Sequence, residues 1–215
     1  MSTRANGEGR VLPKEVSERD LVELAETFPS TFLLIGSGAG LQYANPAKAI
    51  DEAASLLKRI EEDKDHRDGD ARCLFVFGGD TADPKNPDLG YLVQQLKRHH
   101  AEEGSAVCSV QSWPEVDTHV DFVLKYDREY VGDKEYWGGV VDGNPVAATR
   151  HYLSEDMQRL LTAVVCVGGG NIAKQELQLA IAKGIDYHYI RAEVRNKREG
   201  SNPFGPTDDF INSSM

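Results

Sequence analysis

The stretch that decides the fold is a short apolar run that ends in a glycine-rich loop: Thr31-Phe32-Leu33-Leu34-Ile35-Gly36-Ser37-Gly38-Ala39-Gly40. A continuous apolar run of this length predicts a strand that is buried on both faces. The stretch after the loop, residues 46–60, carries apolar side chains at helical spacing: Ala49, Ile50, Ala53, Leu56, Leu57 and Ile60. The sequence therefore predicts a strand, a glycine loop and a helix in succession.

The same order of elements recurs twice further along the chain. A second apolar run over residues 73–77 leads into Gly78-Gly79-Asp80 and a helix over residues 89–96. A third run over residues 163–167 leads into Gly168-Gly169-Gly170-Asn171 and a helix over residues 172–183. Shorter apolar runs predict further strands at residues 106–110, 120–126 and 187–190. Strands alternating with amphipathic helices predict a Rossmann-like, doubly wound α/β fold, with a mostly parallel sheet and helices on both faces.

This pattern divides the chain into three regions. Residues 1–30 are expected to be an N-terminal extension with a short helix over residues 14–27. Residues 31–192 are expected to form the Rossmann-like domain, with a β-hairpin around the turn signal Asp142-Gly143-Asn144. Residues 193–215 are rich in Asn, Ser, Gly, Pro and charge, so we expect a flexible C-terminal tail.

The charge of the chain argues against one class of partner. A formal net charge of −11 over 215 residues repels a phosphate backbone, so nucleic acid is not expected as a partner. A small phosphorylated ligand stays compatible with this charge, because a helix amino terminus and a few backbone N–H groups can hold it locally. No run is long and apolar enough to predict a membrane span or a signal peptide, so we expect no membrane partner.

The cysteines are expected to be free, buried thiols. Cys73, Cys108 and Cys166 each lie in or beside a short apolar run, and no close Cys-His spacing suggests a metal site. We therefore expect neither a metal nor a cofactor. His99 and His100 are expected to end a helix, where a positive charge suits the helix dipole. Free thiols are typical of a reducing compartment, so the expected location is the cytoplasm.

Three glycine clusters follow three of the predicted strands. In a parallel sheet they would lie along one carboxyl edge, where ligands of open α/β folds bind. Glycine permits positive φ and close backbone approach, and the following helix points its positive end at a phosphate or carboxylate. The same glycines also suit tight strand-to-helix turns that hold no ligand, and both interpretations stay open. The expected ligand-binding residues are Gly36, Ser37, Gly38, Gly40, Gly78, Gly79, Asp80, Gly168, Gly169, Gly170 and Asn171.

The first cluster departs from the dinucleotide-binding fingerprint. Its third glycine, Gly40, comes one residue early, and the second strand ends in Gly78-Gly79 where that fingerprint has a ribose-binding acid. Asp80 comes later, inside the loop. A dehydrogenase is therefore not favoured.

Taken in order, these motifs resemble the Lonely Guy phosphoribohydrolases, which belong to the wider SLOG superfamily of Rossmann-like nucleotide binders. The resemblance runs from about residue 32 to residue 190. Its most specific part aligns residues 168–176 with the family motif Pro-Gly-Gly-x-Gly-Thr-x-x-Glu, although Ile172 and Ala173 stand where the family has glycine and threonine. The resemblance implies a nucleotide or nucleoside-phosphate ligand, hydrolysis of an N-glycosidic bond, and a homodimer.

The same resemblance implies two catalytic residues. Glu176 would act at the ribose, and Arg150 would orient the substrate. Simpler interpretations stay open, because Asn171 favours the N-cap of a helix in which a carboxylate at Glu176 suits the dipole, and Arg150 is also typical of an exposed helix start. The alternative function is a non-catalytic nucleotide sensor or interaction module with the same fold.

Overall fold

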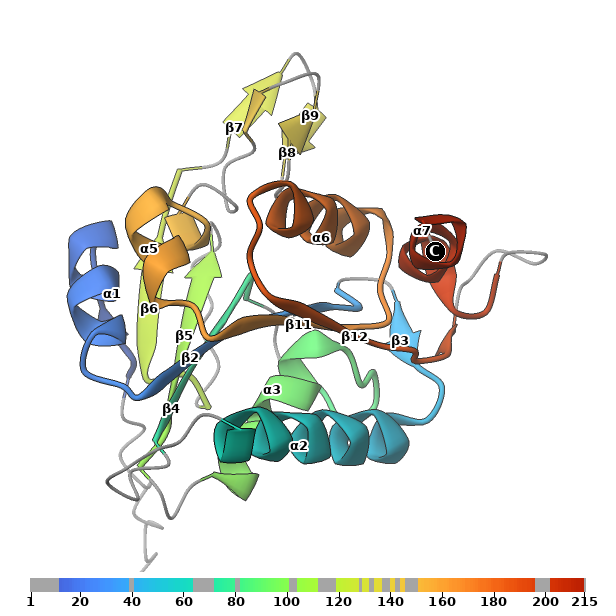
Figure 1. Ribbon diagram of the computed structural model, residues 1–215, viewed down its shortest axis with the longest axis horizontal. Coiled ribbons are helices and arrows are strands. Elements are labelled where there is room, and N and C mark those ends of the chain that lie inside the picture. The colour runs from blue at the N-terminus through green and yellow to red at the C-terminus, as the bar shows by residue number, and fades with distance from the viewer. Residues whose placement is uncertain are drawn as a thin grey trace, which may run out of the picture.

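Among the described residues of the computed structural model, seven parallel strands form the central sheet (Figure 1). The structure describes residues 12–38, 41–63, 72–79, 82–100, 104–111, 119–127, 129–131, 134–136, 140–141, 144–145, 151–195 and 202–214. The strands lie in the order β1 (Lys14–Glu15), β6 (Phe122–Lys125), β5 (Ala106–Gln111), β4 (Cys73–Phe77), β2 (Ser30–Gly36), β11 (Ala163–Val167) and β12 (Tyr187–Ile190). Each neighbouring pair is parallel, as the sequence predicts.

Helices cover both faces of this sheet (Figure 1). One face carries α2 (Pro46–Asp63) and α3 (Leu89–His99), and the other carries α1 (Glu18–Ala25), α5 (Glu155–Leu160) and α6 (Asn171–Ala182). A further helix, α7 (Gly205–Ser214), packs beside α6. The predicted Rossmann-like, doubly wound α/β fold is therefore confirmed. Within the part of the chain that the structure describes, no helix is both long and apolar enough to cross a membrane.

The core forms two layers because successive residues of a strand point to opposite faces. In β2, Phe32 and Leu34 belong to the layer beneath α2 and α3. Leu33 and Ile35 belong to the layer beneath α1, α5 and α6. All four side chains are buried, and each contributes roughly 1.5–3 kcal/mol relative to an exposed side chain. Burial on both faces explains why the apolar run of β2 is continuous.

The N-terminal segment begins with a strand and not with the expected helix. Lys14–Glu15 pairs with β6 as the edge strand β1, so α1 starts only at Glu18. A capping box fixes this start: Ser17 Oγ accepts from the Asp20 N–H at 3.2 Å, and the Asp20 carboxylate accepts from the Ser17 N–H at 2.9 Å. Leu21 of α1 is fully buried against the sheet, so this segment contributes to the core.

Among the described residues, three short antiparallel pairs lie outside the central sheet. They are β3 (Gln42–Tyr43) with β13 (Val194–Arg195), β7 (Glu129–Val131) with β8 (Lys134–Tyr136), and β9 (Val140–Val141) with β10 (Asn144–Pro145). The last pair confirms the hairpin expected around Asp142-Gly143-Asn144, although residues 142–143 themselves lie outside the described residues.

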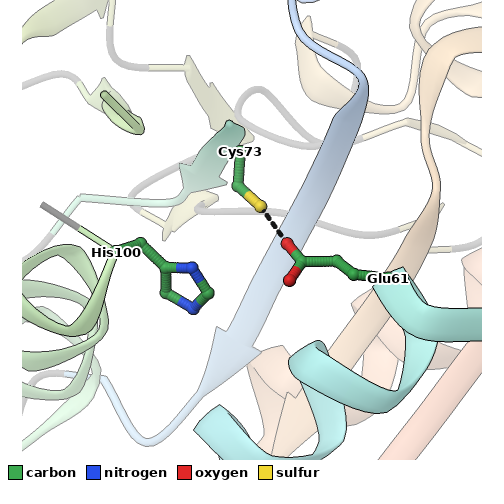
Figure 2. Close-up of side chains that lie close together, drawn as sticks. All are labelled: Glu61, Cys73 and His100. Carbon is green, nitrogen blue, oxygen red and sulfur yellow. Dashed lines mark hydrogen bonds between the residues drawn. The ribbon is translucent and has the colours of Figure 1, made fainter. Parts of the chain in front are cut away.

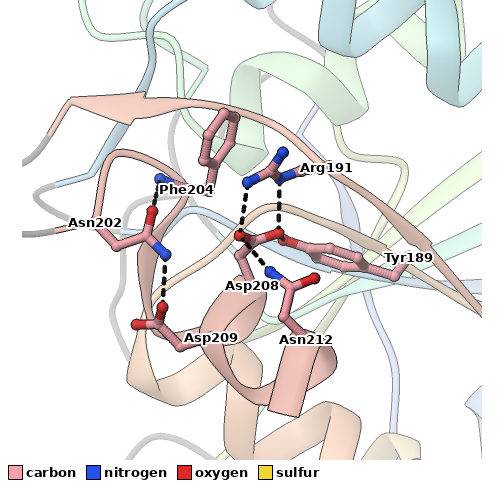
Figure 3. Close-up of polar contacts among 7 residues, drawn as sticks. All are labelled: Tyr189, Arg191, Asn202, Phe204, Asp208, Asp209 and Asn212. Carbon is pink, nitrogen blue, oxygen red and sulfur yellow. Dashed lines mark hydrogen bonds and ion pairs between the residues drawn. The ribbon is translucent and has the colours of Figure 1, made fainter. Parts of the chain in front are cut away.

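The segment from residue 193 onward, expected to be a flexible tail, contains β13 and α7. Asp208 of α7 is 1% exposed and accepts from the Arg191 guanidinium at 3.0 and 3.2 Å (Figure 3). The Tyr189 hydroxyl and the Asn212 amide donate to the same carboxylate at 3.3 and 2.9 Å. The tail prediction was wrong here because one buried, fully hydrogen-bonded carboxylate, that of Asp208, holds the helix in place. The sequence of this helix has no apolar stripe from which it could be predicted.

Candidate functional site

The three glycine loops leave the central sheet at one edge. Gly36 at the end of β2 pairs with Val167 at the end of β11, and Leu34 of β2 pairs with Phe77 at the end of β4. Because these strands are parallel, the loops that follow them meet at the carboxyl edge. The chain proceeds from β2 to β4 on one side, and β11 lies on the other, so the strand order reverses at β2. Ligands of open α/β sheets bind at such a reversal.

Most of the predicted ligand-binding residues can be placed at this edge. The structure describes Gly36, Ser37, Gly38, Gly78, Gly79, Gly168, Gly169, Gly170 and Asn171. Gly40, Asp80 and the predicted catalytic residue Arg150 lie outside the described residues, so their roles stay predictions.

The first glycine, Gly36, is required by the packing of the protein itself. A Cβ atom at this position would lie 2.5 Å from Tyr43 Oη and 2.7 Å from the Val167 carbonyl oxygen. The Tyr43 hydroxyl donates to that carbonyl at 3.0 Å and accepts from the Ser37 N–H at 3.3 Å. Burial raises the pKa of Tyr43, so this hydroxyl stays protonated and holds β2 and β11 together beneath the site.

Ser37 brings a hydroxyl to the same place. Its side chain is fully buried, and its Oγ has no hydrogen-bond partner among the described residues. Its carbonyl accepts from the Leu89 N–H at 2.7 Å, which joins the first loop to the start of α3. A buried hydroxyl without a partner is costly, so Ser37 is suited to hydrogen-bond a ligand.

The third loop is shaped by the segment that follows it. Gly168 and Gly169 have φ of +56° and +125°, values that favour glycine. A Cβ atom at Gly169 would lie 2.5 Å from Ala173 Cβ, and one at Gly205 would lie 2.5 Å from the Gly169 carbonyl oxygen. The Thr207 hydroxyl donates to the Gly170 carbonyl at 3.2 Å. The start of α7 therefore covers one side of this loop.

The second loop is more open. A Cβ atom at Gly78 would meet only the Tyr152 hydroxyl, at 3.9 Å, among the described residues. Gly79 follows with φ of +66°, a value that favours glycine. Among Gly36, Gly78, Gly168, Gly169 and Gly170, Gly78 is thus the one that other described atoms crowd least.

Glu176 places a buried carboxyl beside this edge. It lies on α6, is 7% exposed, and its carboxylate accepts a hydrogen bond from the hydroxyl of the buried Tyr152. Burial raises the pKa of Glu176 from 4.5 to about 7, and the hydrogen bond from Tyr152 opposes part of that increase. Glu176 can therefore hold or release a proton near neutral pH, as an acid–base catalyst must.

The helix around Glu176 differs from the sequence prediction in its cap. Gly170 is the N-cap and makes no side-chain hydrogen bond, whereas Asn171 is the exposed first residue of α6. Asn171 is therefore not the N-cap, and Glu176 is the sixth helical residue, beyond the first turn where the dipole acts most strongly. Among the departures from the family motif, Ile172 is 46% exposed and Ala173 is buried.

A second carboxyl with a raised pKa lies at this edge. Asp88 is the N-cap of α3, and its Oδ1 accepts from the Tyr91 N–H at 3.4 Å. Burial raises the pKa of Asp88 to about 6, against the opposing effect of backbone N–H groups. The sequence analysis missed Asp88. The signal available was an acid at a helix start that follows a glycine loop.

Tyr152 was also missed, because nothing in a single sequence tells a tyrosine at a site from one in the core. The cysteines are free and buried as expected: Cys73, Cys108 and Cys166. At the carboxyl edge the structure brings together Glu176, Tyr152 and the backbone at Gly78. No family model matches the chain, and no curated protein shows significant similarity to it.

Proposed function

We propose that the protein binds a nucleotide or nucleoside phosphate at the carboxyl edge and hydrolyses its N-glycosidic bond, with Glu176 as the acid–base group. The observation that carries this proposal is the buried Glu176 carboxyl, whose pKa is raised to about 7 beside glycine loops at the strand-order reversal. A buried acid with a shifted pKa at such a place is typical of functional sites. The resemblance to the Lonely Guy phosphoribohydrolases supports the same reaction class and extends the proposal to a cytoplasmic homodimer.

The binding part of the proposal rests on backbone chemistry. The N-termini of α3 and α6 lie at the carboxyl edge, where their partial positive ends favour a phosphate. The peptide groups at Gly78 are open to close approach, and Ser37 supplies a hydroxyl that has no hydrogen-bond partner among the described residues. These groups would hold the ligand despite the net charge of −11, because they act locally.

The reaction balances with Glu176 alone carrying the proton. The C1′–N bond breaks, the base leaves with the electron pair, and the ionised Glu176 stabilises the ribosyl cation. Water then adds to C1′ and gives a proton to Glu176, which passes it to the departing base. The products are the free base and ribose phosphate. A group with a pKa near 7 serves both transfers, because neither form is strongly favoured at neutral pH.

A non-catalytic nucleotide sensor is the second candidate. Two observations favour it: α7 covers one side of the third loop, and Ala173 lacks the hydroxyl that the family motif has there. A sensor would bind the same ligand and release no base.

The first prediction separates these two functions through Glu176→Gln. The change keeps the volume and still accepts from Tyr152, but it removes the proton carrier. We expect the full chain to bind AMP, or another nucleoside 5′-monophosphate, with nearly unchanged affinity. Base release should fall by about 100-fold or more, the usual contribution of a general acid–base group. Calorimetry measures the affinity, and chromatography of the free base measures turnover.

Glu155→Gln is the matched control, because Glu155 is exposed on α5 and should leave both quantities unchanged. Binding without base release by the wild type would favour the sensor. Equal turnover by wild type and Glu176→Gln would refute the role of Glu176, and a wild type that binds none of these nucleotides would overturn the proposal as a whole.

A further inference from the structure

Three metal-ligating side chains meet at the opposite edge of the sheet. Glu61 comes from the last turn of α2, Cys73 is the first residue of β4, and His100 caps the end of α3. One donor atom from each, a carboxylate oxygen, the thiol sulfur and an imidazole nitrogen, lie within 4.8 Å of one another (Figure 2). The glycine loops do not include any of these residues.

The fold explains why residues so far apart in sequence converge. In a parallel α/β sheet each helix runs back to the amino edge, where the next strand begins. Cys73 pairs with Ser30 at the amino ends of β4 and β2, and the ends of α2 and α3 return to this edge. Glu61, Cys73 and His100 are therefore brought together by the fold, and they form no short metal-binding motif in the sequence.

The cluster is largely enclosed by the protein. Cys73 is fully buried, His100 is 7% exposed, and Glu61 is half-buried. The Cys73 thiol donates a hydrogen bond to the Glu61 carboxylate, so these two groups are already in contact. The His100 ring lies 5.5 Å from the Phe75 ring, centroid to centroid, in an edge-on arrangement that fixes its plane. The three donors thus approach one another from three rigid elements.

We propose that Glu61, Cys73 and His100 bind one divalent zinc ion. Sulfur, imidazole nitrogen and carboxylate oxygen together form a donor set that Zn²⁺ accepts, whereas Mg²⁺ and Ca²⁺ prefer oxygen alone. Zinc bonds of about 2.0–2.3 Å place tetrahedral ligands roughly 3.3–3.8 Å apart, so small side-chain rotations suffice. The thiol releases its proton to solvent when the metal binds, and water takes the fourth position.

The proposed ion has a structural role. It would join the ends of α2 and α3 to the start of β4 at the amino edge, whereas the glycine loops lie at the carboxyl edge. Metal binding should therefore stabilise the fold, since a ligand that binds only the native state raises Tm. This inference does not depend on the proposed hydrolysis.

The test uses the full chain after treatment with a chelator. We expect one equivalent of Zn²⁺ to bind and to raise Tm, and Co²⁺ in its place to give a thiolate-to-metal charge-transfer band. Cys73→Ser should abolish that band. Glu61→Gln and His100→Gln should each weaken Zn²⁺ binding by more than about 10-fold, at least the loss seen when an outer-shell partner is removed.

Each variant has a matched control nearby or of the same type. Glu62→Gln and His99→Gln change exposed neighbours, and Cys108→Ser changes another buried thiol. All three should bind Zn²⁺ as the wild type does. A wild type that binds no Zn²⁺, or a cobalt band that persists in Cys73→Ser, would overturn the proposal. If Cys73→Ser does not fold, the half-buried Glu61→Gln provides the test. An unchanged affinity of that variant for Zn²⁺ would also overturn the proposal.

Discussion

Burial of the Glu176 carboxyl makes the stability of the folded protein depend on pH. The pKa rises from 4.5 to about 7 on folding, so between these values the unfolded chain loses a proton that the folded protein keeps. The free energy of unfolding therefore falls as the pH rises through this window, by about 3 kcal/mol in total. Below pH 4.5 both states are protonated, and above pH 7 the loss is complete.

The second prediction follows for Glu176→Gln. Because glutamine carries no charge, the variant should be more stable than the wild type at pH 8 and nearly equal to it at pH 4. For a chain of this size the increase in Tm should be roughly 2–4 °C for each kcal/mol. Thermal unfolding at the two pH values measures it. An equal Tm difference at both would show that the burial of the charge does not cause the effect.

The glycines of the three loops differ in what a side chain would do. Gly78 has room for a Cβ atom, whereas Gly169 has φ of +125° and a Cβ atom there would lie 2.5 Å from Ala173 Cβ. Interference with ligand approach can therefore be tested at Gly78. A substitution at Gly169 tests folding instead, even though the sequence alone marks both as loop glycines.

The third prediction compares Gly78→Ala with Gly169→Ala. Gly78→Ala should keep the Tm of the wild type and bind AMP at least about tenfold more weakly, since its methyl group would stand on the open backbone beside Tyr152. Gly169→Ala should lower Tm, because both backbone strain and a clash result. Thermal unfolding and calorimetry measure the two effects. Full affinity in Gly78→Ala would remove the second loop from the site.

At the scale of elements, α7 depends on one carboxylate. Asp208 is buried beneath Arg191, whose guanidinium also stacks on the Phe204 ring at 3.8 Å. The same helix supplies Thr207, which donates to Gly170. Loss of the Asp208 charge should therefore loosen both α7 and the third glycine loop.

The fourth prediction concerns Asp208→Asn. Breaking a fully buried pair costs about 3–5 kcal/mol, but the Arg191 side chain is 58% exposed, so we expect roughly 1–3 kcal/mol. Amide hydrogen exchange should become faster in α7 and in residues 168–170. Asp209→Asn is the control, since Asp209 is the exposed neighbour. Unchanged exchange in the third loop would mean that α7 does not support it.

The elements that sequence analysis finds are those whose pattern comes from burial. β2, β4 and β11 are continuous apolar runs because both of their faces are covered. β1 consists of Lys14 and Glu15, two exposed residues that form a strand only because β6 offers a free edge. The end of the chain was missed for a similar reason, because the stability of α7 depends on a partner in β12 and the loop after it.

The same limit applies to the candidate sites. The glycine loops can be found in the sequence because they directly follow predicted strands. Glu176 can be found because its distance from the third loop matches the spacing of the motif Pro-Gly-Gly-x-Gly-Thr-x-x-Glu. The partnership of Glu176 with Tyr152, the raised pKa of Asp88, and the convergence of Glu61, Cys73 and His100 depend on distances between separate elements. Sequence spacing carries no information about such distances until the order of strands in the sheet is known.

At the scale of the whole molecule, two sites occupy opposite ends of one sheet. The glycine loops and Glu176 lie at the carboxyl edge, and the proposed zinc ligands lie at the amino edge. β2 and β4 reach both ends, so the same strands support both sites. The strands carry the packing and the loops carry the chemistry, which is the usual division in α/β proteins.

The reversal of strand order at β2 also has a consequence for folding kinetics. β2 meets β4 after a single crossover helix, but it meets β11 only after most of the chain: the Thr31 N–H bonds to Thr162, 131 residues away. Closing so long a loop costs more entropy and slows the step that requires it. We therefore expect β11 to join late. The pairing of β2 with β11 would then be the last part of the sheet to form on folding and the first to be lost when the sheet opens.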